Sequence, residues 1–265
     1  MKIPFSKYHA NGNDFIIISS HDLDNKSLNN TLIARLCRRH KGIGADGLFV
    51  VSASKKYDFV IDYYNSDGSW ETFCANGSRC AVKFNNDILN YNNGLRFKTG
   101  ASIHSFKINS SGLISMSMKI PIYKSDCISL LGFEGFFVDS GARHFICKSD
   151  NLDDHYILEM GRKIRNARDF SPSGINVNFY RLIDTGQVQI KTYEKGIENI
   201  VLSCSSGSAA VVFHLAQKGC VTSPVITLSA GGNLNYTFDD NWTEFFCQGP
   251  ADLCYRGEFD LNDYI

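Results

Sequence analysis

Two cysteines in similar surroundings are the residues of this chain best suited to acid–base chemistry. Residues 74–82 read Cys-Ala-Asn-Gly-Ser-Arg-Cys-Ala-Val, and residues 204–212 read Cys-Ser-Ser-Gly-Ser-Ala-Ala-Val-Val. Cys, Gly, Ser and Val recur in the same register, and the two segments lie about half the chain length apart. The repeat indicates two related thiol sites, at Cys74 and Cys204.

Each of these cysteines is expected at the start of a buried helix. A small, glycine-containing turn leads into an apolar segment in both repeats, and the helix predicted over 207–218 is apolar on nearly every side. A thiol at a helix N-terminus lies beside backbone N–H groups that have no partner within the helix, and near the positive end of the helix dipole. Such a position favours the thiolate and binds anions.

Two thiols on opposite faces of one carbon can invert its configuration. One, as the thiolate, removes the α-proton, and the other, as the thiol, delivers a proton to the opposite face. Two helix N-termini directed at the substrate carboxylate would stabilise the enolate-like charge that develops. The repeat therefore predicts a two-base racemase or epimerase that needs no metal and no other cofactor.

Composition excludes several other classes of function. The chain has 265 residues, a net charge of zero and 43% hydrophobic residues, which is typical of a globular protein and gives no basic surface for nucleic acid. Neither a signal peptide nor a membrane-spanning segment is expected, so we predict a cytoplasmic protein. Nine cysteines, an odd number without a Cys-x-x-Cys pair, argue against a disulfide framework, a zinc site or a thiol redox site.

The pattern of elements predicts an α/β (α+β) fold with two pseudo-symmetric halves. Short strands bounded by turn residues dominate, and they are expected at 14–19, 48–52, 59–64, 95–98, 102–108, 113–119, 135–138, 187–193, 225–228 and 244–248. Helices are expected at 27–40, 77–88 and 207–218. The predicted first half is 1–117 with 255–265, and the predicted second half is 118–254.

The sequence resembles the diaminopimelate epimerase family, whose members are pyridoxal-independent amino-acid epimerases with two cysteines. Matching blocks run nearly end to end, at 7–15, 39–47, 64–69, 74–80, 173–179, 193–196, 249–251 and 257–258. The resemblance implies two similar halves, each a strand barrel wrapped around a central helix, with the active site in the cleft between them. It also implies a small-molecule amino-acid substrate and a possible homodimer.

The resemblance assigns roles to particular residues. Cys74 and Cys204 would be the acid–base pair, and His144 would lie near the thiols and tune them. Asn76 and the N–H groups after both cysteines would hold the reacting carboxylate, while several polar side chains would grip the distal amino-acid group. The full set of expected substrate-binding residues is Asn13, Asn65, Ala75, Asn76, Gly77, Asn176, Glu194, Lys195, Ser205 and Ser206.

The chain departs from the family pattern where the distal carboxylate of diaminopimelate would bind. Lys195 replaces an arginine whose planar fork lysine cannot reproduce, and Ala142 and Arg143 replace an Asn-Pro pair. Ile200 and Val201 replace a Glu-Thr pair, Ala75 replaces a glycine after the first cysteine, and Ser205 replaces one after the second. Three functions therefore stay open: a diaminopimelate epimerase, a racemase of another amino acid, and a non-catalytic amino-acid-binding relative.

Structural roles compete with the functional ones for several of these residues. His144 could be a buried structural histidine as well as a group that tunes a thiol. Asn13, Asn65 and Asn176 lie beside turn residues, where asparagine commonly caps the backbone, and Glu194 could be a solvated charge at a strand end.

Overall fold

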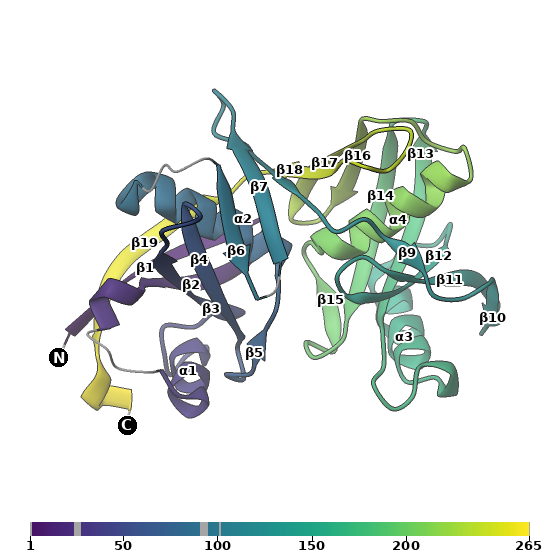
Figure 1. The fold of residues 1–265 in the computed structure, drawn as a ribbon. Helices are drawn as coiled ribbons and strands as arrows, with labels where there is room; N and C mark the ends of the chain where they lie inside the picture. The colour runs from purple at the N-terminus through teal and green to yellow at the C-terminus, as the bar shows by residue number, and fades with distance from the viewer. Residues whose placement is uncertain (1, 24–27, 91–94, 101, 265) are drawn as a thin grey trace. The chain divides into compact units, whose positions relative to one another are not determined.

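The computed structural model describes residues 2–23, 28–90, 95–100 and 102–264, and the chain divides into two units. The first unit comprises Met1–Met116 and Gly249–Ile265, and the second comprises Ser117–Gln248 (Figure 1). The two units are described separately below. In the described residues no helix combines the length and the apolar character needed to cross a membrane.

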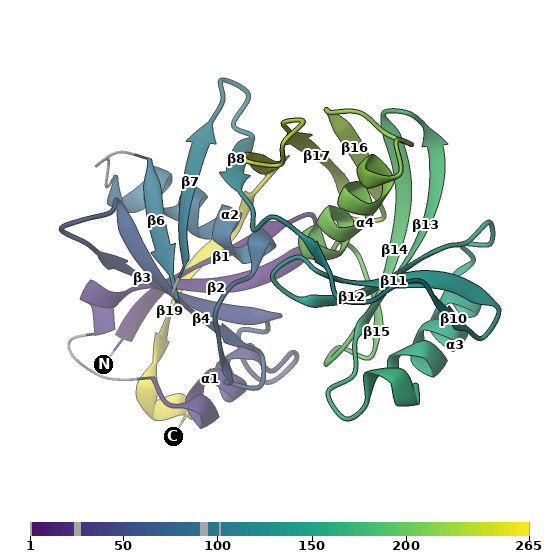
Figure 2. The same cartoon turned by 45° about the vertical axis from the view of Figure 1, so that its right-hand side comes forward.

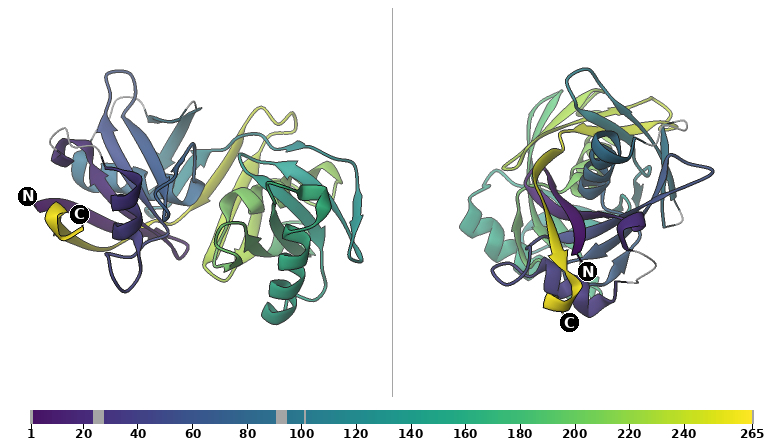
Figure 3. Two further views of the ribbon diagram at one scale, coloured as in Figure 1. Left: turned by 90° about the horizontal axis from the view of Figure 1, so that it is seen from below. Right: turned by 90° about the vertical axis from the view of Figure 1, so that its left-hand side faces the viewer.

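The first unit is a curved sheet with one central helix. Its strands are β1 (Lys2–Ala10), β2 (Asn13–Ser19), β3 (Gly47–Ala53), β4 (Phe59–Asn65), β5 (Trp70–Glu71), β6 (Arg96–Thr99), β7 (Ser102–Ile108), β8 (Ile114–Ser117) and β19 (Asp252–Asp260). Its helices are α1 (Asn30–Cys37) and α2 (Ala75–Phe84), with the short turns η1 (Ser20–Leu23), η2 (Asn85–Leu89) and η4 (Leu261–Tyr264). The chain ends meet here, because β1 and β19 pair along their length (Figure 3).

The second unit has the same plan. Its strands are β9 (Ile122–Tyr123), β10 (Ile128–Leu130), β11 (Phe133–Asp139), β12 (Arg143–Lys148), β13 (Asn176–Asp184), β14 (Gln187–Glu194), β15 (Asn199–Val201), β16 (Val225–Ser229), β17 (Gly232–Phe238) and β18 (Phe245–Gly249). Its helices are α3 (Asp154–Arg165) and α4 (Ser205–Gln217), with the short turn η3 (Arg168–Phe170).

Strand pairing shows that the two units repeat one topology. In the first unit β1–β2 is antiparallel, β2–β3 parallel, β3–β4 antiparallel and β4–β6 parallel, and β5 adds to β4. In the second unit β11–β12, β12–β13, β13–β14 and β14–β16 follow the same sequence of directions, and β15 adds to β14. The expected α/β fold with two pseudo-symmetric halves is confirmed.

Each unit packs its sheet against one buried helix. Helix α2 contacts β1, β2 and β3, and helix α4 contacts β12, β13, β14, β16 and β17 (Figure 2). The sequence accounts for this placement, because residues 209–213 of α4 are all small or apolar and all buried. A helix that is apolar on all sides is stable only where packing removes every face from water.

The predicted strands are found within a few residues of their expected positions, but several elements were missed. The missed elements are β1, β5, β9, β10, β12, β13, β15, β17, β19 and α3. Helix α3 carried readable signals: Asp153 caps its first turn by accepting from the N–H groups of His155 and Tyr156, and three basic residues lie in its last turn. Its buried residues, Ile157, Gly161 and Ile164, have helical spacing. The strand-like segments on either side made this helical pattern hard to recognise in the sequence.

Several boundaries differ from expectation, and α4, expected over 207–218, starts two residues earlier. The helix expected over 27–40 is the shorter α1, and residue 27 lies outside the described residues. The helix expected over 77–88 starts two residues earlier as α2 and continues as one π-helical turn, η2, while residues 91–94 of the Asn-rich stretch lie outside the described residues. The chain returns to the first unit at Gly249 rather than at 255, because β19 pairs with β1 from Asp252 onward.

Candidate active site

Both repeat cysteines occupy the same position at the start of their helices. Cys74 is the N-cap of α2, with φ −138° and ψ 116°, and Cys204 is the N-cap of α4, with φ −132° and ψ 101°. Their carbonyls accept the first helical hydrogen bonds, from Ser78 N at 2.8 Å and Ser208 N at 2.9 Å. Both thiols are half-buried. The extended backbone of an N-cap directs each side chain past the first-turn N–H groups, which have no partner within the helix.

The glycine three residues after each cysteine lets the helix approach the strands beneath it. A Cβ atom on Gly77 would lie 2.1 Å from Phe49 Cζ, and one on Gly207 would lie 2.0 Å from Asn178 Oδ1. Real Cβ atoms do not approach other atoms so closely, so only glycine allows this packing. The glycines of the repeat therefore set how far each helix N-terminus descends toward its sheet.

In the first unit the side chain of Asn76 is fixed by two neighbours. Its Oδ1 accepts from Arg79 Nη2 at 2.9 Å, and its Nδ2 donates to Asn13 Oδ1 at 3.2 Å. Arg79 is fully buried and also donates to Asn11 Oδ1 at 2.8 Å and to Pro250 O at 3.3 Å. A guanidinium buried one turn inside α2 therefore connects the start of the helix to the β1–β2 turn and to the segment before β19.

Asn13 is also tied to a cluster of charged side chains. Its Nδ2 donates to Asp46 Oδ2 at 2.7 Å, and Arg39 bridges Asp46 and Asp14 at 2.8 Å and 2.6 Å. Lys7, which is nearly fully buried, pairs with Asp14 at 2.8 Å. Burial alone would raise the pKa of Asp14, but hydrogen bonds from Arg39 and Lys7 outweigh it and lower that pKa to about 2.

Asn65 lies at the end of β4 and shapes the following turn. Its backbone N–H donates to Ser69 O at 2.9 Å, its Oδ1 accepts from Tyr63 Oη at 2.7 Å, and its Nδ2 donates to Ser69 Oγ at 3.2 Å. The structure therefore gives Asn65 a turn-forming role. A role in binding substrate stays a prediction.

In the second unit a chain of polar side chains leads from Cys204 into the core. Cys204 Sγ is 3.6 Å from Ser206 Oγ, which is 3.0 Å from His144 Nε2. His144 Nδ1 is 2.9 Å from Asn178 Nδ2, and Asn178 Oδ1 accepts from Thr192 Oγ1 at 2.8 Å. Burial lowers the pKa of His144 to about 3, against the opposing effect of Asp139, so the imidazole is neutral near pH 7.

Asn176 lies at the start of β13, and Glu194 and Lys195 lie at the adjacent end of β14. Asn176 Oδ1 accepts from the backbone N–H of Lys195 at 2.9 Å, which joins the two strand ends. The turn that follows is held by Glu198, whose Oε1 accepts from Gly196 N at 3.0 Å and pairs with Arg165 at 2.8 Å. Lys195 is exposed, and in the described ranges no carboxylate pairs with its ammonium.

The residues that depart from the family pattern have structural partners in this unit. The Arg143 guanidinium lies over the ring of Phe137, 5.1 Å from its centroid. Ile200 packs against the core around α3. Ala142 accepts from Ser140 N at 3.2 Å through its backbone carbonyl.

Hydrogen bonds join the sequence-predicted residues into groups within each unit. In the first unit Asn13 and Asn76 are joined by one, and Ala75, Asn76 and Gly77 form the first turn of α2, buried behind the half-exposed Cys74. In the second unit Ser206 links Cys204 to His144, and Ser205 is held through its carbonyl by Tyr236 Oη at 2.7 Å.

Sequence reasoning missed Arg79, Asn178 and Thr192, which are all buried and all hydrogen-bonded to predicted site residues. Asn178 carried a signal, since an asparagine in a strand core usually has a defined partner.

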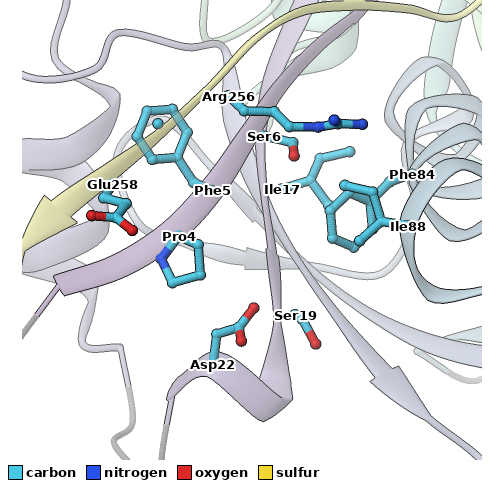
Figure 4. Close-up of a pocket in the computed structure, with 11 residues that line it drawn as sticks. Pro4, Phe5, Ser6, Ile17, Ser19, Asp22, Phe84, Ile88, Arg256 and Glu258 are labelled. Atoms are coloured by element: carbon cyan, nitrogen blue, oxygen red, sulfur yellow. The ribbon is translucent and has the colours of Figure 1, made fainter.

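A groove elsewhere in the first unit contains none of the predicted site residues. It has a volume of about 360 Å³ and lies beside β1, β19 and the end of α2 (Figure 4). The apolar side chains of Ile17 and Phe84 line it together with the charged side chains of Arg256 and Glu258. The groove is therefore separate from the residues around Cys74 and Cys204 that the sequence analysis singled out.

Comparisons with known proteins identify relatives along nearly the whole chain. The sequence profile described as "Diaminopimelate epimerase" matches residues 5–119. A diaminopimelate epimerase of Flavobacterium psychrophilum is 34% identical over 258 residues, covering 94% of this chain and 97% of the relative. One from Chlorobaculum tepidum is 33% identical and covers 94% of this chain and 98% of the relative.

Solved structures share the fold at low sequence identity. A PhzF-family phenazine biosynthesis protein of Bacillus anthracis has a TM-score of 0.76 at 13% identity, covering 98% of this chain and all of that one. A hydroxyproline epimerase of Agrobacterium vitis has a TM-score of 0.72 at 10% identity, covering 99% of this chain and 93% of that one.

The curated relatives and the shared fold show that the chain is an isomerase of the amino-acid epimerase class. Within that class, the chain belongs to the diaminopimelate epimerase family.

Proposed function

We propose that this protein converts LL-diaminopimelate to the meso form by two-base proton transfer between Cys74 and Cys204, without a cofactor. The observation that carries the proposal is that both thiols are N-caps of the two central helices. It is supported by curated relatives named diaminopimelate epimerase that match nearly the whole chain. The product is a precursor of lysine and peptidoglycan, and we expect a cytoplasmic enzyme that acts as a homodimer.

The proposed reaction balances with one proton in and one proton out. A thiolate on one cysteine takes the α-proton, so one C–H bond breaks and one S–H bond forms. The other thiol gives its proton to the opposite face, so one S–H bond breaks and the inverted C–H bond forms. The charge that accumulates on the substrate carboxylate meanwhile is stabilised by the first-turn N–H groups of the helices.

Exchange of the α-proton in deuterated water tests this function directly. We expect wild-type protein to convert LL-diaminopimelate to the meso form with uptake of solvent deuterium at the α-carbon, and Cys74→Ser and Cys204→Ser each to lose at least about 1,000-fold in this inversion, since inversion requires both groups. Cys220→Ser is the matched control, because Cys220 is half-buried but lies after the C-terminal end of α4, and it should retain wild-type inversion. Full inversion in both active-site variants would refute the two-thiol mechanism.

A second candidate is a racemase that uses the same thiols on another amino acid. It is favoured by one specific feature, the exposed Lys195 where the family pattern has arginine. If the substrate is diaminopimelate, Lys195→Arg should raise kcat/KM about tenfold by restoring a forked, charge-assisted contact to the distal carboxylate. If Lys195→Arg abolishes exchange of a different L-amino acid that the wild type turns over, the second candidate replaces the first.

A further inference from the structure

The two helix N-termini rest on strands of opposite chemical character. In the first unit three packed aromatic residues lie on β2, β3 and β4: Phe15, Phe49 and Tyr63. In the second unit the matching strands β12, β13 and β14 carry three hydrogen-bonded polar residues: His144, Asn178 and Thr192. The positions match in register, because Phe49 is paired with Tyr63 across one ladder and Asn178 with Thr192 across the other.

The approach of the glycines confirms that the positions correspond. A Cβ on Gly77 would meet Phe49 at 2.1 Å and then Phe15 at 3.3 Å. A Cβ on Gly207 would meet Asn178 at 2.0 Å and then His144 at 3.3 Å. The same two topological positions therefore support the start of each helix, with aromatic rings in one unit and polar groups in the other.

The direction of the polar chain is fixed from its buried end. Asn178 Nδ2 lies 2.9 Å from His144 Nδ1 and 3.5 Å from the carbonyl oxygen of Phe145. A carbonyl only accepts, so the NH₂ of the amide faces this side, and its Oδ1 faces the hydroxyl of Thr192, which donates to it. His144 Nδ1 must then accept, which leaves the imidazole proton on Nε2.

The remaining steps carry that direction to the thiol. His144 Nε2–H donates to Ser206 Oγ at 3.0 Å, so the single hydroxyl proton of Ser206 is left for Cys204 Sγ at 3.6 Å. An imidazolium would place a second N–H against the amide NH₂ of Asn178, and burial keeps His144 neutral in any case. Every donor in the chain therefore points toward Cys204.

We infer that Asn178 and Thr192 are positioning residues that hold His144 as its Nε2–H tautomer. The hydroxyl of Ser206 then donates to Cys204, and this hydrogen bond makes Cys204 the thiolate base of the resting enzyme. The inference rests on the proposed two-thiol function, which then assigns Cys74 the thiol that donates the proton. In the first unit the matching strand positions carry the packed aromatic residues Phe15, Phe49 and Tyr63 instead. The hydrogen bond that Cys204 accepts from Ser206 stabilises the thiolate form of Cys204.

Two measurements without substrate test this inference. The first is the nitrogen NMR signal of His144, identified as the histidine signal that His144→Gln removes. We expect the neutral Nε2–H tautomer in wild-type protein. A neutral Nδ1–H tautomer would overturn the inference.

The second measurement is the pH dependence of iodoacetamide alkylation at Cys204, followed by mass spectrometry of its peptide. Ser206→Ala should move the midpoint up by about one pH unit, because a hydrogen bond to a charged group is lost, and Ser206→Thr should restore it. Thr192→Val should move the midpoint in the same direction by less. Thr227→Val is the matched control: Thr227 is also buried in this unit, but its hydroxyl donates to Leu234 O, so the midpoint should not move.

The outcomes separate this inference from the proposed function. If the alkylation midpoint of Cys204 is the same in Ser206→Ala as in Thr227→Val, the hydrogen-bond chain does not act on Cys204. This conclusion holds for any substrate of the enzyme. If the tautomer and the midpoint shifts are as expected but no amino acid exchanges its α-proton, the relay stands and the assignment of Cys204 as a catalytic base is overturned.

Discussion

Replacing Gly207 with alanine tests whether close approach of α4 to its sheet is required for both stability and catalysis. The new Cβ would lie 2.0 Å from Asn178 Oδ1, about 1.4 Å short of ordinary contact. Asn178 cannot swing away, because it is fully buried and bonded to His144 and Thr192. Either these bonds break or the start of the helix rises.

The expected magnitude follows from two opposing effects. Overpacking of this kind costs about 1–3 kcal/mol, and breaking the buried hydrogen bonds adds about 1 kcal/mol. Alanine returns about 1 kcal/mol through its higher helix propensity. We expect a net loss of about 2 kcal/mol and a Tm lower by about 4–8 °C. A shift of about 1 Å at the thiol should cost about 100-fold in α-proton exchange.

Thermal unfolding and α-proton exchange provide the assays, with Gly186→Ala as the matched control. Gly186 lies in the same unit at ordinary φ, and its nearest neighbour for a Cβ is Asp184 Oδ1 at 3.6 Å, so its replacement should change stability by less than about 0.5 kcal/mol.

A double-mutant cycle isolates the clash itself. Because Asn178→Ala removes the obstructing amide, the double variant should be more stable than the sum of the two single losses predicts. Additive losses, or a Gly207→Ala protein that melts and exchanges like Gly186→Ala, would refute the close-approach argument.

Three further predictions concern acid stability and the turn after β14. Asp14 has a pKa of about 2 in the folded protein, below its ordinary value, so its contribution to the free energy of unfolding is complete above about pH 4 and is lost as the pH falls toward 2. Asp14→Asn should therefore make the free energy of unfolding, measured in urea, less dependent on pH in this range. An unchanged pH dependence would contradict this prediction. His144 has a pKa of about 3 in the folded protein, so between pH 6.5 and 3 only the unfolded chain takes up a proton at this residue. The free energy of unfolding should therefore fall by up to about 1.4 kcal/mol per pH unit as the pH decreases. His144→Gln should reduce this pH dependence, and an unchanged dependence would show that His144 is charged in the folded protein. Glu198→Gln removes the ion pair with Arg165 that holds the turn carrying Lys195, so KM should rise about tenfold with little change in kcat, and a loss in kcat alone would assign the turn another role.

Local signals in the sequence were sufficient for the two cysteine helices and most strands. The small residues after each cysteine allow an N-cap, and the apolar run that follows Gly207 allows only a fully buried helix. Strand β7 was predicted over its observed residues, because turn-forming residues in the sequence flank it closely on both sides. Helix α3 was missed although its cap and its spacing were readable, since the surrounding strand pattern dominated that region.

The division of the chain was less accessible, because strand pairing is a long-range property. Residues 249–254 gave no local sign of belonging with the N-terminus, and only the ladder between β1 and β19 places them there. The register of such a ladder depends on which face of each strand is buried, which distant residues decide.

The sequence by itself determined the repeat on which the proposed chemistry rests: a duplicated Cys-x-x-Gly at two helix starts, where backbone N–H groups lie beside a thiol. Only the tertiary structure decided how the two thiols differ. His144, Asn178 and Thr192 come from three separate strands, and they become one directed hydrogen-bond chain because parallel and antiparallel pairing bring β12, β13 and β14 into register. No local pattern encodes that alignment, since it arises from burial of polar groups that must find partners across the sheet.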